Sequence, residues 1–172
     1  MIKKLLLNLF LVFFLTSGLF AQDDWFAGAS TEINGQTRWG AAIGGGLLFG
    51  YDLDYRYAVG LKASYFNNLV TVSCVETDAI FRFYLPWDFF SFSLENKFYI
   101  QAEAGLIVFF EYGKSFPAFS GGLTLGWRFK FGEKWFLEPA IRCGYPHIWG
   151  VNVTAGMNFS IPIKKVNGGE SG

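Results

Sequence analysis

Two acidic residues at a spacing of two, Glu76 and Asp78, are the first candidates for chemistry in this sequence. Carboxylates that lie close together on one face can serve as a general acid and a general base. Residues at this spacing share a face in a strand, and Arg82 follows on the same parity. Basic side chains beside the two carboxylates would neutralise them. We therefore interpret the pair as part of an ion-paired network and not as a catalytic dyad.

The sequence offers little for nucleophilic or metal chemistry. Its single histidine, His147, has no serine beside it, whereas a nucleophilic enzyme needs its base within hydrogen-bond reach of the nucleophile. One histidine and two separated cysteines fall short of a structural zinc site. Gly44–Gly46 is not followed by a helical pattern, so it is not a phosphate-binding loop. We expect no catalytic residue, no metal and no cofactor, and we place His147 in a loop or an interface.

The two cysteines, Cys74 and Cys143, could form one disulfide if the protein is exported. The alternation described below places Cys74 on a polar face and Cys143 on an apolar face, in strands that are not neighbours. A disulfide needs two close and convergent Cβ atoms. We therefore favour two unpaired cysteines, with the disulfide as the alternative.

The candidate residues lie in segments that alternate between apolar and polar residues. In Phe98–Gly113, Ile100 and Ala102 fall on one face, while Gln101 and Glu103 fall on the other. A period of two is that of a β-strand. Turn residues separate most of these segments, and we find no helical periodicity and no second domain. The predicted strands are Trp25–Ile33, Thr37–Tyr51, Tyr55–Phe66, Thr71–Tyr84, Lys97–Tyr112, Ala118–Phe131, Trp135–Tyr145 and Val151–Ile163.

The two faces of these predicted strands differ in charge. One face carries no charged residue, and its aromatic residues lie mostly near segment ends, as where Trp39 and Tyr51 bracket Ala41–Leu47. A lipid-facing band has this distribution, with aliphatic residues at mid-membrane and aromatic residues at both interfaces. The other face carries acids and bases in nearly equal number. Its charged residues are Glu32, Arg38, Arg56, Lys62, Glu76, Asp78, Arg82, Glu103, Glu111, Arg128, Lys130, Glu138 and Arg142.

The N-terminus has the layout of a secretory signal peptide. Lys3 and Lys4 precede the apolar run Leu5–Leu15, and small and polar residues follow as far as Ala21. The apolar run is too short to favour a membrane anchor, which is the alternative. We predict a signal peptide over residues 1–21 and a barrel domain over residues 22–172, with a polar tail over 164–172. The mature chain is nearly neutral, which gives no footprint for nucleic acid.

Strands of these lengths can cross a membrane, and lipid forbids an open sheet edge because unpaired backbone groups find no water there. The sequence therefore predicts an all-β fold, an eight-stranded antiparallel up-and-down transmembrane β-barrel. The polar face would point into a lumen just wide enough for side chains. We predict that an ion-paired lumen network closes this space. Its predicted members are Glu76, Asp78, Arg82, Glu103, Glu111, Arg128, Glu138, Arg142, Arg56 and Lys62.

The last predicted strand contains a short pattern of polar, glycine and hydrophobic positions, met by Thr154, Gly156, Phe159 and Ile161. This pattern resembles the signal read by the β-barrel assembly machinery of double-membraned bacteria. The mature chain as a whole resembles the small outer-membrane barrels, the class of the outer-membrane protein A transmembrane domain. The resemblance implies a bacterial outer-membrane location, periplasmic termini, and contacts with outer-membrane lipid and the assembly machinery. The chain departs from the class in its short outer connections and its polar tail.

We predict a non-enzymatic, monomeric outer-membrane protein with a structural or surface-associated role. Some small outer-membrane barrels are deacylases, and their sequence pattern resembles His-x-Ser. Here Trp149, and not a serine, stands two residues after His147, so this pattern is not met. A narrow channel for small solutes is one alternative. A soluble periplasmic barrel with an apolar ligand inside, and with the two faces inverted, is another. The connection Leu85–Asn96 is expected on the periplasmic side as an extended hairpin or aromatic belt, with a partner-contact surface as its alternative.

Overall fold

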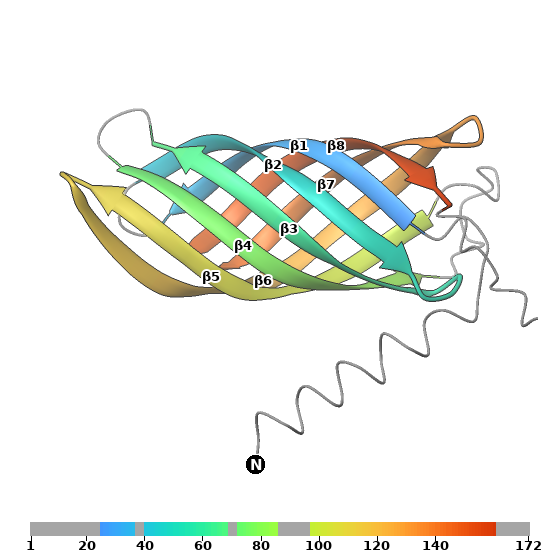
Figure 1. The fold of residues 1–172 in the computed structure, drawn as a ribbon, viewed down its shortest axis with the longest axis horizontal. Helices are drawn as coiled ribbons and strands as arrows, with labels where there is room; N and C mark the ends of the chain where they lie inside the picture. The colour runs from blue at the N-terminus through green and yellow to red at the C-terminus, as the bar shows by residue number, and fades with distance from the viewer. Residues whose placement is uncertain (1–24, 37–39, 69–71, 86–96, 161–172) are drawn as a thin grey trace, which may run out of the picture.

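The computed structural model describes residues 25–36, 40–68, 72–85 and 97–160. These residues form eight antiparallel strands, each paired with the next, and β8 closes the barrel by pairing with β1 (Figure 1). The predicted fold class is therefore confirmed. The strands are β1 (Trp25–Gln36), β2 (Gly40–Asp52), β3 (Tyr57–Asn67), β4 (Val72–Leu85), β5 (Lys97–Glu111), β6 (Lys114–Phe131), β7 (Trp135–Tyr145) and β8 (His147–Phe159).

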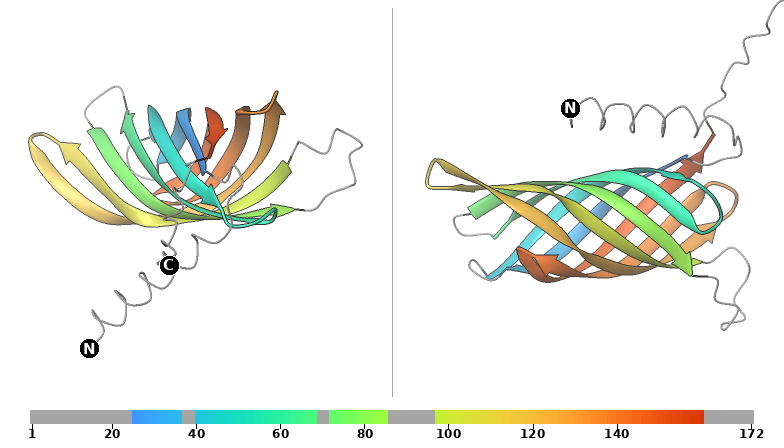
Figure 2. Two further views of the ribbon diagram at one scale, coloured as in Figure 1. Left: turned by 45° about the vertical axis from the view of Figure 1, so that its right-hand side comes forward. Right: turned by 90° about the horizontal axis from the view of Figure 1, so that it is seen from below.

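The strands run at a tilt to the barrel axis, and the two ends of the barrel differ (Figures 1 and 2). At one end, which we call the terminal end, the first residue of β1 pairs with the last residue of β8, Trp25 with Phe159. The strand ends that flank residues 86–96 also lie there, because Leu85 pairs with Phe98. The opposite end, which we call the hairpin end, carries the turn between β5 and β6.

The turn between β5 and β6 is shorter than the sequence predicts. Glu111 pairs with Lys114, so only Tyr112 and Gly113 lie between the strands. Their φ angles are 48° and 75°. Two positive φ values define the type I′ turn, whose twist matches that of the flanking strands. The predicted loop over residues 113–117 is therefore wrong, and β6 begins at Lys114.

At the hairpin end β6 extends past its other neighbour, β7. Pairing between β6 and β7 begins with Gly121 and Tyr145, so residues 114–120 of β6 pair only with β5. Figure 1 shows this hairpin, in yellow, projecting beyond the neighbouring strands. An exposed strand edge invites pairing with another chain, and proline and lysine oppose it. Pro117 and Lys114 occupy this edge.

Other strand boundaries also differ from the prediction, such as the end of β1, which lies at Gln36 and not at Ile33. β3 begins at Tyr57 and not at Tyr55, because the side chain of Asp54 stabilises the preceding turn. This side chain accepts hydrogen bonds from the backbone N–H groups of Arg56 (2.6 Å) and Tyr57 (2.8 Å). β8 begins at His147, because pairing with β1 continues as far as Gln36.

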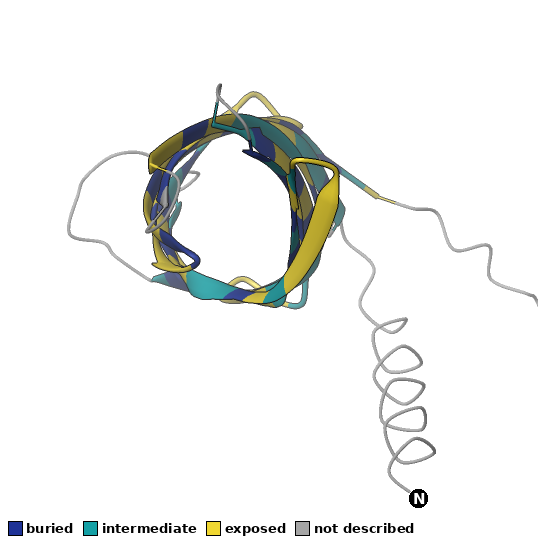
Figure 3. Ribbon diagram, turned by 90° about the vertical axis from the view of Figure 1, so that its left-hand side faces the viewer, coloured by how far each residue is buried: buried dark blue, intermediate teal, exposed yellow. Residues whose placement is uncertain are grey.

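The apolar face points outward along the whole barrel. Leu47 and Leu61 are 68% and 60% exposed, whereas Arg82 and Arg128 are each 1% exposed. Buried and exposed positions alternate along the strands when the barrel is viewed down its axis (Figure 3). The alternative of a soluble barrel with an apolar interior is therefore wrong, because it requires the opposite arrangement.

Aromatic residues form a girdle at each end of the outer face. Tyr57, Phe131 and Trp135 are exposed at the terminal end, and Tyr65, Tyr145 and Trp149 at the hairpin end. Exposed aliphatic residues such as Leu61, Ile141 and Val153 lie between the two girdles. This is the order of side chains expected from the membrane interface to the hydrocarbon core. Within the described ranges, no helix is long and apolar enough to cross a membrane.

Candidate functional site: the barrel lumen

The inward face of the strands places an unusual number of buried polar side chains in the lumen. Charged residues are seldom fully buried unless they are paired. The buried ionised residues come from six of the eight strands, so they converge only when the barrel closes. They are Glu32, Lys62, Glu76, Asp78, Arg82, Glu103, Arg128, Glu138 and Arg142.

In the terminal half of the lumen, Glu138 on β7 binds two arginines. Arg82 on β4 donates to both carboxylate oxygens, at 2.8 and 3.1 Å, and Arg128 on β6 donates through Nε. The hydroxyl of Tyr99 adds a hydrogen bond of 3.3 Å to Oε2. A carboxylate that accepts this many hydrogen bonds offsets much of the cost of its own burial.

Aromatic rings enclose the two arginines. The guanidinium carbon of Arg82 lies 3.9 Å from the centroid of Tyr99, and that of Arg128 lies 4.5 and 4.3 Å from the centroids of Phe26 and Phe136. Cation–π attraction is strongest when the cation is desolvated, as both arginines are. The rings thus fill the lumen and stabilise its charges together.

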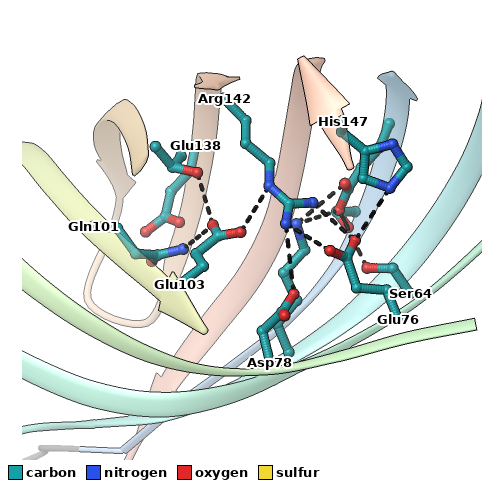
Figure 4. Close-up of polar contacts among 12 residues, drawn as sticks. Ser64, Glu76, Asp78, Gln101, Glu103, Glu138, Arg142 and His147 are labelled. Atoms are coloured by element: carbon teal, nitrogen blue, oxygen red, sulfur yellow. Dashed lines mark hydrogen bonds and ion pairs between the residues drawn. The ribbon is translucent and has the colours of Figure 1, made fainter. Parts of the chain in front are cut away.

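In the hairpin half, Arg142 on β7 joins three carboxylates (Figure 4). It binds Glu76 through two hydrogen bonds of 2.8 and 2.6 Å, in the bidentate geometry that suits a planar guanidinium. Its Nε lies 2.9 Å from Glu103, and its Nη2 lies 3.7 Å from Asp78. Ser120 donates a further hydrogen bond to Glu76.

Gln101 connects the two halves of the lumen. Its Oε1 accepts from Nε of Arg82 at 2.9 Å, and its Nε2 donates to Glu103 at 2.7 Å. At the terminal end the chain of contacts continues from Arg82 through Tyr84 (3.5 Å) to Asp52 (3.0 Å). A chain of hydrogen bonds, completed by the ion pair between Glu103 and Arg142, therefore runs from the terminal mouth to Glu76.

A third ion pair lies at the side of the network. Nζ of Lys62 on β3 is 2.9 Å from Oε1 of Glu32 on β1, and Ser30 donates to the same carboxylate at 2.9 Å. Both side chains are buried. The strand between them, β2, presents Gly44 and Gly46 on its inner face, which leaves room for this contact across it.

Two clusters of buried apolar side chains also fill the lumen, one toward each end. The cluster at the terminal end is Phe26, Leu48, Ala58, Ile80, Tyr84, Tyr99 and Phe136. The cluster at the hairpin end is Ala42, Phe66, Val72, Cys74, Ile107 and Phe109, with Ala118 packed against it. All the clustered residues except the partly buried Ala118 are at most 7% exposed. At the terminal end, the rings of this cluster lie against Arg82 and Arg128, so charged and apolar side chains share the same level of the lumen.

The structure places eight of the ten predicted network residues in the buried lumen: Lys62, Glu76, Asp78, Arg82, Glu103, Arg128, Glu138 and Arg142. Arg56 is not among them. It is exposed in the turn between β2 and β3, where its guanidinium lies over the ring of Tyr55. Glu111 is half-buried at the last position of β5, and none of the ion pairs among the described residues includes it.

The prediction that His147 lies in a loop or interface is wrong. The residue is fully buried at the start of β8, with its ring against Phe66 and its Nε2 3.6 Å from Glu76. Ser120 donates to Glu76 and not to the histidine. Among the described residues, no group of three or more histidine, cysteine, aspartate or glutamate residues has a geometry that could hold a metal ion.

Several lumen residues were not among those predicted from the sequence. Glu32 pairs with Lys62, and Asp52, Tyr84, Tyr99 and Ser120 make the contacts described above. Glu32 could have been predicted from its parity, because it lies on the polar face in the sequence. Tyr84 and Tyr99 have the same inward parity, but they carry no charge and so were not counted in the predicted network.

The remaining predicted features lie as follows. Cys74 points into the lumen from β4 and Cys143 outward from β7, and no disulfide joins them. Of the assembly-signal residues, Thr154 and Gly156 face inward and Phe159 ends β8, where its ring lies near Phe49. Ile161, the predicted signal peptide, the polar tail and most of Leu85–Asn96 lie outside the described residues.

A closed eight-stranded barrel with an apolar exterior and an ionised interior has the fold of the small outer-membrane β-barrels, the class that the sequence resembles. Searches with models of protein families and against curated proteins give no match. Among solved structures, the N-terminal β-barrel domain of Pseudomonas aeruginosa OprF aligns at 16% identity with a TM-score of 0.56, covering 81% of this chain and 100% of that one.

Two further structures share the same fold. Neisserial surface protein A aligns at 13% identity with a TM-score of 0.61, over 83% of this chain and 99% of that one. The outer membrane protein OprG from Pseudomonas aeruginosa aligns at 12% identity with a TM-score of 0.61, over 82% of this chain and 98% of that one. The likeness is one of fold.

Proposed function

We propose that this chain is an integral protein of the bacterial outer membrane, without catalytic activity, whose closed lumen serves a structural or surface-associated role in the envelope. The fold and the two aromatic girdles support the location, since aromatic side chains at both ends of an apolar outer band follow the polarity of a bilayer. The lumen offers no nucleophile in contact with His147 among the described residues.

The filling of the lumen carries this proposal. Arginines and carboxylates bind one another across the barrel, and buried apolar side chains pack around them and toward both ends. A solute that crossed the lumen would have to separate desolvated ion pairs and displace packed rings such as Phe26 and Phe136. Breaking a buried pair is strongly unfavourable, so this filling favours a plug over a pore.

Planar-bilayer recording separates the plug from the alternative of a narrow solute channel. We expect the refolded mature protein to give no steady unitary conductance. Insertion in the same sample is verified by electrophoresis with and without boiling, because a closed membrane barrel resists detergent when cold. A steady unitary conductance from the inserted protein would replace the plug by the channel.

We also propose that the protein contacts outer-membrane lipid through its outer face and is a monomer that the β-barrel assembly machinery inserts. The apolar outer face supports the contact with lipid. The pattern at Thr154, Gly156 and Phe159 supports insertion by the assembly machinery. Carbonate extraction of bacterial membranes tests the location, since an integral barrel stays with the membrane pellet. Release into the soluble fraction would contradict it.

A further inference from the structure

Both carboxyl oxygens of Asp78 on β4 are buried in the lumen without a hydrogen bond. The residue is 1% exposed, and neither Oδ1 nor Oδ2 has a hydrogen-bond partner among the described residues. Its one ion pair within the described ranges is long, with Oδ2 3.7 Å from Nη2 of Arg142. By residue type Asp78 belongs with the ionised side chains of the lumen, but a carboxylate in these surroundings lacks the hydrogen bonds that offset its burial.

Arg142 cannot provide those hydrogen bonds, because the N–H groups of the nitrogen that faces Asp78 are already taken. Nη2 has two N–H groups, and they donate to Glu76 at 2.6 Å and to Ser120 at 3.4 Å. At the other side of the guanidinium, Nε lies 2.9 Å from Glu103. Figure 4 shows the three acidic side chains converging on this one guanidinium. Asp78 is thus the most distant of three carboxyl groups that share it.

The strands on either side of Asp78 supply it with no side-chain donor. Opposite Asp78 lie Gly105 on β5 and Lys62 on β3. Gly105 has no side chain, and Nζ of Lys62 is bound to Glu32, at 2.9 Å from Oε1. The ion pairs of the described residues include none between Lys62 and Asp78. Although the ladder places Asp78 opposite a lysine, this lysine therefore neutralises a different carboxylate.

Two further polar side chains reach this part of the lumen. Ser120 on β6 has a single hydroxyl proton, which it donates to Glu76. His147 on β8 is fully buried with its Nε2 3.6 Å from Glu76, and neither of its ring nitrogens has a hydrogen-bond partner in the described part of the chain. Among the described residues, the titratable and charged groups around Asp78 are Glu76, Glu103, Lys62, Arg142 and His147.

We propose that Asp78 is a proton-binding site, and that the folded barrel holds it as a neutral carboxylic acid at neutral pH. A neutral acid costs much less to bury than a carboxylate, and its O–H is a donor that the carboxylate lacks. Two carboxyl groups that lie close together do not both ionise readily, and Glu76, two positions along the same face, already binds Arg142. A proton needs no cavity, so the packed lumen can hold this ligand. Release of the proton at high pH would place a third negative charge beside Arg142 and weaken the hairpin half of the plug.

This site gives the stability a pH dependence of defined sign. An unfolded aspartate is ionised above about pH 4, so from that pH until folded Asp78 releases its proton, the folded state binds one proton more than the unfolded state. Stability therefore falls as the pH rises through this interval. A carboxyl group that is ionised in both states, as expected for an ion-paired residue such as Glu138, contributes no such slope above about pH 5.

Urea unfolding of the refolded mature chain in nonionic micelles, at pH values from 5 to 7, tests the site in the wild type and in Asp78→Asn. Asparagine has the shape of the neutral acid, and the other titratable groups are the same in both proteins. We expect the unfolding equilibrium constant of the wild type, divided by that of Asp78→Asn, to rise about tenfold per pH unit, the dependence for one proton. A ratio that does not change with pH, or an Asp78→Asn protein that does not fold, would overturn the proposal.

A His147→Gln background separates Asp78 from the nearby histidine. The same ratio, measured between His147→Gln and the double variant that also carries Asp78→Asn, should rise with pH as steeply as in the wild-type background. If the rise disappears without the histidine, the proton belongs to His147 and the assignment to Asp78 is wrong.

Infrared spectroscopy in an ester-free detergent detects the proton directly, because a protonated carboxyl group has a C=O stretching band that a carboxylate lacks. At pH 7 the wild-type protein should show this band, and Asp78→Asn should lack it. Glu138→Gln is the matched control, since it also replaces a buried carboxyl group by an amide, and it should keep the band. No band in the wild type, or an equal band in Asp78→Asn, would contradict a protonated Asp78.

Discussion

Glu138 is the residue on which the terminal half of the lumen depends. It is the one carboxylate that contacts both Arg82 and Arg128 within the described part of the chain, and it is completely buried. Asp52 lies at a longer distance from one of these arginines. The loss of Glu138 would therefore leave two desolvated guanidinium groups with Asp52, 3.7 Å from Arg128, as their one counterion among the described residues.

We predict that Glu138→Gln lowers the free energy of unfolding by about 3–5 kcal/mol, the usual cost of removing one member of a buried ion pair. Glutamine keeps the shape of the side chain, so the change reports charge and not packing. Urea unfolding of the protein refolded in micelles measures it. Glu133→Gln, in the exposed turn before β7, is the control and should change the stability little. Equal stability of the two variants would contradict this account.

Parity along the strands was sufficient to predict most of the lumen charges and insufficient at the turns. Glu76, Arg82 and Arg142 were found because a strand residue of known parity has only two directions to point. Arg56 was misplaced because the preceding Asp54 holds the chain in a turn for two residues more than the pattern suggests. Parity could not predict which residues pair across the barrel, such as Glu32 with Lys62, because these residues meet only in the closed barrel.

At the scale of the strand pair, glycine and aromatic residues are matched across neighbouring strands. Phe26 lies opposite Gly50, Tyr99 opposite Gly126, Phe136 opposite Gly156 and Phe66 opposite Gly44. In each pair the ring covers the position that a Cβ on the glycine would take. The glycines thus let large rings lie flat against the inner wall, which is how a narrow barrel accommodates both rings and arginines.

We predict that Gly50→Ala destabilises the barrel by about 1–3 kcal/mol, the range for an overpacked core. The added methyl group would overlap the ring of Phe26, which Arg128 and Phe136 prevent from moving away. Gly45→Ala, on the outer face of the same strand, is the matched control and should cost less. Urea midpoints of both variants provide the measurement.

A second substitution distinguishes overlap from a general intolerance of β2. In Gly50→Ala combined with Phe26→Leu, the smaller side chain vacates the overlapped volume, so part of the lost stability should return relative to the sum of the single changes. Strict additivity of the two changes would show that the ring is not the cause.

Element boundaries show where sequence patterns lose information. The eight strands follow from the alternation alone, but the ends of β6 and β8 depend on their partners. Residues 114–117 contain a proline and exposed polar residues, which read as a loop. Pairing with β5 through a two-residue turn extends the strand over them. The sequence did not predict this turn, because Tyr112 occupies its first central position, where asparagine, aspartate or glycine is usual.

For the whole molecule, the fold followed from one physical condition, that a strand in lipid cannot leave a sheet edge open. Given eight alternating segments and an uncharged face, closure into a barrel was the solution, and β1 does pair with β8. The level at which each charged side chain enters the lumen could not be predicted in the same way, because it depends on the stagger between strands.

The assignment of the outer face to lipid predicts a much larger loss of stability than the same substitution would cause in a soluble protein. Leu61 is 60% exposed and lies midway between the aromatic girdles. On a water-exposed surface, Leu61→Arg would change stability by less than about 0.5 kcal/mol. At the middle of a bilayer the same change costs about 2–4 kcal/mol, because the charge must leave water. We predict the larger cost for the protein folded into lipid vesicles, measured by urea unfolding.

Ser115→Arg, on the same face but in the projecting hairpin beyond the girdle, should cost about 0–1 kcal/mol. If the two arginine variants proved equally stable in vesicles, Leu61 would not be in contact with acyl chains, and the membrane assignment of this face would fail.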